Sequence, residues 1–159
     1  MSVRDTRDLM KFLKPFPEDV RERALWLRKF VWNLYPQANE IIYDNYNAVA
    51  FGWSITDRLG DTFCSIAVGR TSHNVHLGFY WGSKIDDPKG MLLGGGNQYR
   101  YILIHKKSDL PVKYATQLIR KAYAYSLSKM KTAESDLKGA TITKSISAKK
   151  RPPAKAKRA

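Results

Sequence analysis

The stretch of sequence that determines the fold runs from His76 to His105 and reads HLGFYWGSKIDDPKGMLLGGGNQYRYILIH. Its two ends are rich in aromatic and aliphatic residues, as strands are. The connection between them contains Asp87-Pro88, Lys89-Gly90 and three consecutive glycines at 94–96. So many breakers exclude a continuous helix. The stretch therefore predicts two antiparallel strands joined by a shaped surface loop.

The rest of the chain extends this pattern on both sides. Runs of strand composition cover residues 40–46, 48–55, 61–68, 75–81 and 98–105. Short turns separate most of them, which is typical of an antiparallel sheet rather than of βαβ units. A short helix is predicted over 5–14. Long amphipathic helices are predicted between Pro17 and Pro36 and over 110–130, because apolar residues recur there at helical spacing.

Each long helix has an apolar face that must be buried, and one face of a sheet can cover both. The sequence therefore predicts an α+β fold. It is a two-layer sandwich in which an antiparallel sheet of about five strands carries the two long helices together on one face.

Positive charge is concentrated at the C-terminal end. The net charge of the 159 residues is +14. Residues 129–159 contain ten Lys or Arg and two acids, a net of +8, which leaves +6 for residues 1–128. Helical periodicity also ends near Met130. We therefore expect a sandwich domain over 1–130 and a disordered basic tail rich in Lys, Pro and Ala over 131–159. The run ATITKSIS (140–147) could pair locally, but its polar surroundings favour a solvated linker.

The end of this tail predicts contact with polyanions. Six cations lie close together without an acid among them: Lys149, Lys150, Arg151, Lys155, Lys157 and Arg158. Flexible cations neutralise phosphates and release counterions, so salt-sensitive, sequence-independent contact with nucleic acid is expected. The alternative is a solubilising extension with no fixed partner.

Composition also bounds the cellular setting. No apolar run approaches the length of a membrane span, and the N-terminus MSVRDTRDLM has no apolar segment of a secretory signal. Cys64 is the single cysteine, and it lies in a strand-like run where packing is the favoured role. We expect a cytoplasmic protein without disulfides.

No catalytic, cofactor or metal residue is assigned from the motifs. His73 and His76 form an H-x-x-H spacing, but no cysteine or nearby acid completes a metal set. The glycines at 94–96 lead into a strand, whereas phosphate-binding glycine loops lead into a helix, so a turn is favoured.

Aromatic side chains are the stronger indication of a site. Within 75–81, alternate side chains share a face, so Val75 and Leu77 point to the core while His76 and Tyr80 point away from it. The same alternation places Tyr99 and Tyr101 on the uncovered face. We therefore predict a ligand or partner face made of Tyr80, Tyr99, Tyr101 and His76. The alternative is that loops or a second copy in a homodimer cover these residues.

Three segments resemble one family. They are YPQANEIIYDNYNAVAF, HLGFYWGSKIDDPKGMLLGGGNQYRYI and a closing helix introduced by SDLP. Over about residues 9–130 the chain resembles the YdhG-like family, a group of small bacterial domains of unknown function. The resemblance implies an α/β sandwich like that of frataxin, and one member group in bacilli is regarded as a frataxin-like iron chaperone. It implies no catalytic residues.

Three functions follow as hypotheses. The favoured one is a non-enzymatic binding module with an open sheet face and a polyanion-binding tail, because no catalytic constellation is present. The alternative is an iron-binding chaperone, with iron implied only by the resemblance. The charge opposes it, since Glu18, Asp19 and Glu22 alternate with arginines rather than forming an acidic ridge. An enzyme acting on a small anionic molecule is the third.

Overall fold

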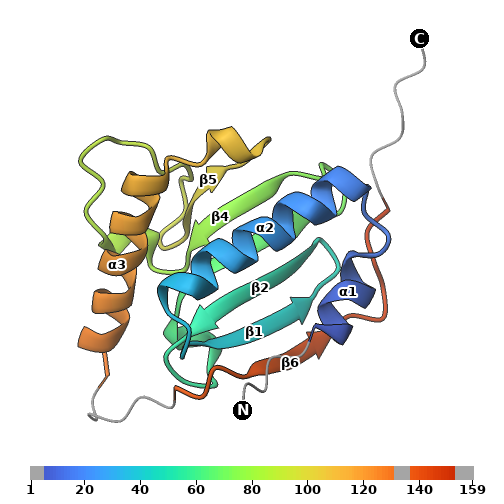
Figure 1. Ribbon diagram of the computed structural model, residues 1–159, viewed down its shortest axis with the longest axis horizontal. Coiled ribbons are helices and arrows are strands. Elements are labelled where there is room, and N and C mark those ends of the chain that lie inside the picture. Colours follow the sequence, from blue (N-terminus) through green and yellow to red (C-terminus); the bar gives the residue numbers. More distant parts are fainter. Residues whose placement is uncertain (1–5, 131–136, 153–159) are drawn as a thin grey trace.

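The computed structural model describes residues 6–130 and 137–152 and has an α+β fold (Figure 1). Its helices are α1 (Arg7–Leu13), α2 (Glu18–Leu34) and α3 (Val112–Ser128), with short 3-10 turns η1 (Leu59–Asp61), η2 (Gly82–Lys84) and η3 (Lys107–Asp109). Its strands are β1 (Asn39–Asp44), β2 (Ala48–Ser54), β3 (Thr62–Gly69), β4 (Val75–Phe79), β5 (Arg100–Leu103) and β6 (Thr141–Ile146). The five predicted strands and three predicted helices are confirmed, with ends shifted by a few residues.

The sheet has the order β5-β4-β3-β2-β1-β6. The first five strands form an antiparallel meander, in which each strand pairs with the next along the chain. β6 instead pairs in parallel with β1. The prediction of a purely antiparallel sheet of about five strands is therefore wrong in its last strand, and the sheet is mixed.

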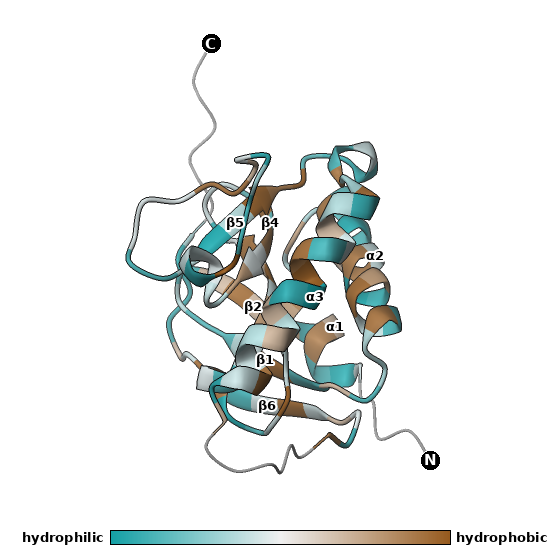
Figure 2. Cartoon of the chain, turned by 90° about the vertical axis from the view of Figure 1, so that its left-hand side faces the viewer, coloured by the Kyte–Doolittle hydropathy of each residue, from teal (hydrophilic) through white to brown (hydrophobic). Residues whose placement is uncertain are grey.

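The helices lie on one side of this sheet, as Figure 2 shows. α2 buries Val20, Ala24, Leu27 and Val31, the residues whose spacing of three and four predicted its apolar face. α3 buries a similar stripe, which includes Leu118 and Ile119. The helical layer and the sheet face beneath it thus enclose one core.

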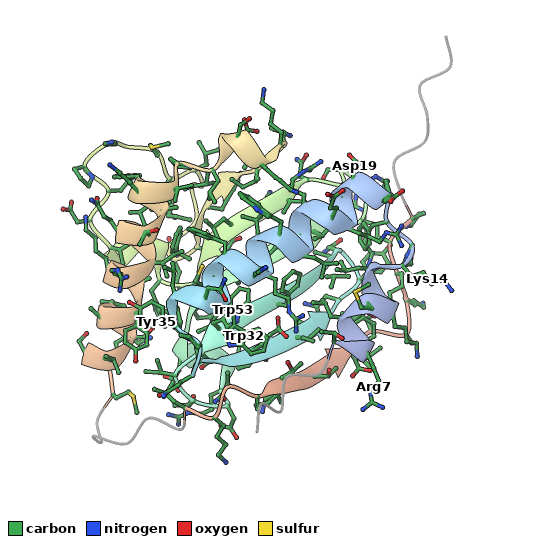
Figure 3. All side chains as sticks on the ribbon, viewed as in Figure 1. Arg7, Lys14, Asp19, Trp32, Tyr35 and Trp53 are labelled. Carbon is green, nitrogen blue, oxygen red and sulfur yellow. The ribbon has the colours of Figure 1, made fainter. Side chains whose placement is uncertain are left out.

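Large side chains fill the covered face of the sheet. Phe51, Trp53 and Phe79 are fully buried there. The rings of Trp32 on α2 and Trp53 meet edge to face with their centroids 6.2 Å apart. Figure 3 shows Trp32, Tyr35 and Trp53 close to the C-terminal end of α2. This aromatic group ties α2 to the central strands.

β6 corrects the predicted boundary at residue 130. Residues 141–146 belong to the sheet, so the expectation of disorder throughout 131–159 is wrong for this segment. Two side chains of β1 hold it. The Asn39 Oδ1 accepts hydrogen bonds from the backbone N–H groups of Lys138 and Ala140 at 3.0 and 3.3 Å. The Thr141 hydroxyl donates to Glu40 Oε1 at 3.1 Å. Residues 131–136 and 153–159 lie outside the described residues.

Within the described part of the chain, none of the helices has both the length and the apolar character needed to cross a lipid bilayer.

Candidate ligand-binding face of the sheet

The face of the sheet that points away from the helices has small residues at its centre. Strand pairing places one row of residues side by side across it: Ile41, Gly52, Ser65, Gly78 and Tyr101. The neighbouring row consists of Tyr43, Ala50, Ala67, His76 and Leu103. We call these two rows the open face. Side chains alternate along strands, so the residues between them, such as Phe51, point into the core. The open face therefore has a low floor on the central strands and taller side chains on the outer ones.

A pocket of about 200 Å³ lies over this floor, and we call it the sheet pocket. It is lined by Ile41, Tyr43, Asn45, Ala50, Gly52, Leu59, Thr62, Ser65 and Tyr80. Gly52 is essential to its depth. A Cβ atom added there would lie 2.9 Å from Ser65 Cβ and 2.9 Å from Thr62 Cγ2, closer than such atoms approach. Only glycine keeps this part of the floor open.

Thr62 gives the sheet pocket an unused polar group. Thr62 as a whole residue is 2% exposed. Its Oγ1 is buried and has no hydrogen-bond partner among the described residues. Burying a hydroxyl without a partner costs about 1–3 kcal/mol. The oxygen has almost no accessible surface, so a bound molecule can become its partner only when the surrounding side chains shift.

Two tyrosines add polar edges without charge. Burial raises the pKa of Tyr43, and the neighbouring Tyr80 raises it further. The Tyr43 phenol therefore stays protonated at neutral pH, and the hydroxyls of both tyrosines can donate or accept hydrogen bonds. The described lining contains no Asp, Glu, Lys, Arg, His or Cys. The sheet pocket is thus suited to an uncharged ligand.

The structure divides the four predicted face residues into two groups. Tyr80 lines the sheet pocket. The His76 and Tyr101 rings stack with centroids 4.1 Å apart and an angle of 3°, and Tyr99 stacks on Tyr101 at 5.8 Å and 21°. These three form a continuous stack on the β4–β5 side of the open face.

Part of this stack is already buried by the protein itself. A Cβ on Gly78 would lie 2.0 Å from the Tyr99 hydroxyl oxygen, so the Tyr99 side chain occupies the space over that glycine. Burial raises the pKa of Tyr99 well above its ordinary value and lowers the pKa of His76. Tyr99 and His76 are therefore uncharged at neutral pH. The stack forms a wall rather than a second cavity.

Several residues of the sheet pocket escaped the sequence prediction. Tyr43, Leu59 and Thr62 were not singled out, although an indication was present. In β2, small residues at Ala48, Ala50 and Gly52 alternate with Val49, Phe51 and Trp53. Large side chains on one face and minimal ones on the other are the pattern of a strand that floors a cavity. Phe51 and Trp53 belong wholly to the core and not to the open face.

No metal centre is apparent within residues 6–130 and 137–152, where no three His, Cys, Asp or Glu side chains form a group. The two histidines of the H-x-x-H spacing point to different surroundings, since His73 contacts Phe16 and His76 contacts Tyr101. Cys64 is buried in the core, and burial raises the pKa of its thiol. It is a packing residue, as expected.

The predicted polyanion-binding residues fall into two sets. Lys149 is exposed. Lys150 and Arg151 contact the folded domain instead, at Asp44 and Asn47 respectively. Lys155, Lys157 and Arg158 lie outside the described residues. The basic tail is therefore attached to the domain at its start.

Comparisons of the chain with protein-family models, with curated proteins and with solved structures found no match.

Proposed function

We propose that the protein is a binding module which holds a small, uncharged, planar molecule in the sheet pocket. The observation that carries the proposal is a preformed pocket floored by Gly52, with the Thr62 hydroxyl buried at its lining and unpartnered among the described residues. Pockets that bind drug-sized molecules measure about 300–1,000 Å³. A volume of about 200 Å³ therefore suits a single ring with one or two polar substituents.

A binding role is favoured over an enzymatic one by the chemistry of the lining. General acid–base catalysis needs a side chain that exchanges a proton near neutral pH. The described lining offers the hydroxyls of two tyrosines and the neutral groups of Asn45, Thr62 and Ser65. These residues orient a molecule through hydrogen bonds and ring contacts.

Phenol is a suitable probe, because its ring matches the aromatic walls and its hydroxyl can pair with Thr62 Oγ1. Toluene has a similar shape and no hydroxyl. Titration of the full chain, followed by amide NMR, should give tighter binding of phenol than of toluene. Thr62→Val should remove most of this preference, about fivefold, since one neutral hydrogen bond contributes about 1 kcal/mol.

Gly52→Ala and Ala67→Val form a matched pair for this test. Both add volume to the open face, but Ala67 does not line the sheet pocket. Gly52→Ala should abolish phenol binding, and Ala67→Val should leave it within about twofold. Equal binding by both variants would place the probe elsewhere and reject the proposal.

Polyanion contact by the C-terminal cations is a second proposal, supported by their number and the absence of acids among them. A truncation at Met130 is unsuitable for testing it, because the truncation would also remove β6 from the edge of the sheet. The combined substitution Lys155→Gln, Lys157→Gln and Arg158→Gln in the full chain avoids this. It should weaken salt-dependent binding of single-stranded DNA, measured by fluorescence anisotropy at low salt. Unchanged affinity would remove these residues from the interface.

A further inference from the structure

A second pocket lies away from the open face, where three separate segments meet. It measures about 500 Å³ and is lined by Pro15, Phe16, Pro17, Arg70, His73, Lys150, Arg151 and Pro152. We call it the basic pocket. Its segments are the connection between α1 and α2, the turn between β3 and β4, and the residues after β6. Figure 3 labels Lys14 and Asp19 on either side of the first of these segments.

The C-terminal segment is held in place at this pocket by specific contacts. The backbone N–H of Arg151 donates to the carbonyl of Tyr46 at 2.8 Å. The Arg151 side chain donates to Asn47 Oδ1 at 3.2 Å. The Thr71 hydroxyl lies 3.4 Å from the carbonyl oxygen of Pro152 and donates to it. These contacts place tail cations beside cations of the domain.

The charges of the basic pocket do not balance. Beneath it, the buried carboxylate of Asp44 accepts a hydrogen bond from Arg70 Nη2 and forms an ion pair with Lys150 Nζ at 2.8 Å. Lys150 Nζ also donates to the backbone carbonyl of Asp44 at 3.0 Å. One carboxylate thus faces two cations, and Arg151 adds a third. None of the described lining residues is acidic. Neutralising Asp44 requires one cation, so the additional positive charge is available to an anionic ligand.

Arg70 is held rigidly for such a role. Its Nε donates to the carbonyl of Asn45 at 2.9 Å, and its guanidinium lies 5.8 Å from the centre of the Phe16 ring. The side chain is 7% exposed. Among the described residues, the third nitrogen, Nη1, forms no hydrogen bond. A guanidinium fixed on two of its nitrogens can present the third to an oxyanion with little loss of conformational entropy.

His73 completes the rim in an unusual backbone conformation. Its φ angle is +57°, and it is the one non-glycine residue with positive φ in the described chain. This conformation is uncommon for residues with a side chain, and such outliers concentrate at binding sites. The His73 ring meets Phe16 edge to face at 5.7 Å. Together with three prolines, Phe16 gives the pocket an apolar wall beside its cations.

We propose that the basic pocket binds a phosphate group attached to a planar or apolar body. The cations pair with the phosphate, and Phe16 contacts the body. A free nucleotide and the backbone of a single-stranded nucleic acid share this chemistry. The proposal does not depend on the sheet pocket. Tyr43 lines the sheet pocket, whereas Asp44 contacts the cations of the basic pocket. These two residues are neighbours on β1, so their side chains point to opposite faces of the sheet.

The test uses the full chain, with adenosine monophosphate, adenosine and inorganic phosphate as probes in calorimetry and amide NMR. Adenosine monophosphate should bind more tightly than either of the other two. Arg151→Gln should weaken it about tenfold, because it removes a charged partner of the phosphate. Lys149→Gln removes the same charge two residues earlier, from a residue that does not line the pocket. It should change the affinity less than about twofold at physiological salt.

His73→Asn is a second variant, since asparagine tolerates positive φ and the fold should be kept. It should weaken the nucleotide severalfold, with thermal unfolding as a check on folding. A short single-stranded DNA, tested on the same variants, shows whether the phosphate comes from a free nucleotide or from a nucleic acid. If the DNA binds the parent chain more tightly than the nucleotide does, and Arg151→Gln weakens it by the same factor, the ligand is a nucleic acid. Equal losses in Lys149→Gln and Arg151→Gln, equal binding of adenosine, or no binding of any phosphate probe would overturn the proposal.

Discussion

The two faces of the sheet differ in the size of their side chains and in the role of those side chains. The covered face carries large apolar groups such as Phe51 and Trp53, and two buried acids, Glu40 and Asp44. The open face carries Gly52, Ser65 and Gly78 in one row. The first face is determined by packing against the helices. The small side chains in the middle of the open face lie lower than the larger side chains around them. This difference in height creates the sheet pocket.

This difference shows where stability and binding reside. Substitutions on the covered face should mainly change the free energy of unfolding. Substitutions on the open face should change ligand binding and have a smaller effect on the free energy of unfolding. The following predictions test that division in order of decreasing effect on stability.

The largest effect is expected at the buried ion pair between α2 and β1. Arg28 donates to both oxygens of Glu40 at 2.7 Å, and the Glu40 side chain is fully buried. Glu40→Leu leaves a buried guanidinium without its partner and should cost about 3–5 kcal/mol in urea unfolding. The double variant Arg28→Met, Glu40→Leu should recover most of that loss. A single variant within about 1 kcal/mol of the parent chain would contradict this assignment.

A moderate effect is expected at the floor of the sheet pocket. Gly52→Ala should destabilise the protein by about 1–3 kcal/mol in the same assay, because the added methyl group has no room beside Ser65 and Thr62. Replacing glycine by alanine at an unhindered site usually stabilises by about 0.4–1 kcal/mol. A gain in stability would therefore show that the floor is not closely packed.

A small effect of opposite sign is expected at Thr62. Thr62→Val removes a buried hydroxyl that has no partner in the described chain. It should leave stability unchanged or raise it by about 1 kcal/mol while weakening phenol binding. A substitution that raises the free energy of unfolding and weakens ligand binding is expected at a residue retained for function. A loss above about 1 kcal/mol would instead indicate that the hydroxyl has a structural partner.

The smallest effect concerns acid pH. Burial lowers the pKa of His76 below its ordinary value of about 6.5. The unfolded chain therefore binds the proton more readily, so the stability contributed by neutral His76 is present above pH ~6.5 and is lost as the pH falls through the folded pKa. Melting curves recorded across this range should show a smaller acid-induced drop for His76→Gln than for the parent. An identical drop would assign the pH dependence to other groups.

Local patterns were sufficient for much of this fold. The periodicity of Val20, Ala24 and Leu27 predicted α2, and the turns between short apolar runs predicted the meander. β6 was missed because the strand with which it pairs, β1, lies about a hundred residues earlier. A parallel pairing over that separation leaves no local signature, and the polar sequence of β6 resembles a linker. It is stabilised by hydrogen bonds to Asn39 and Glu40 rather than by apolar burial.

The candidate sites were predictable to different degrees. Alternation alone placed Tyr80, Tyr99 and Tyr101 on the open face. It did not reveal that Tyr99 occupies the space over Gly78, nor that Leu59 and Thr62 join the sheet pocket from the turn before β3 and the start of that strand. The basic pocket required the tertiary structure entirely, since Phe16, Arg70 and Lys150 come from three distant segments.

The central claim is that the open face holds a ligand in the sheet pocket, and amide NMR of the full chain with phenol tests it most directly. The largest shift changes should fall on Gly52, Thr62, Ser65 and Tyr80, and they should vanish in Gly52→Ala and persist in Ala67→Val. Saturable shifts confined to other surfaces, or none at millimolar phenol, would contradict the claim.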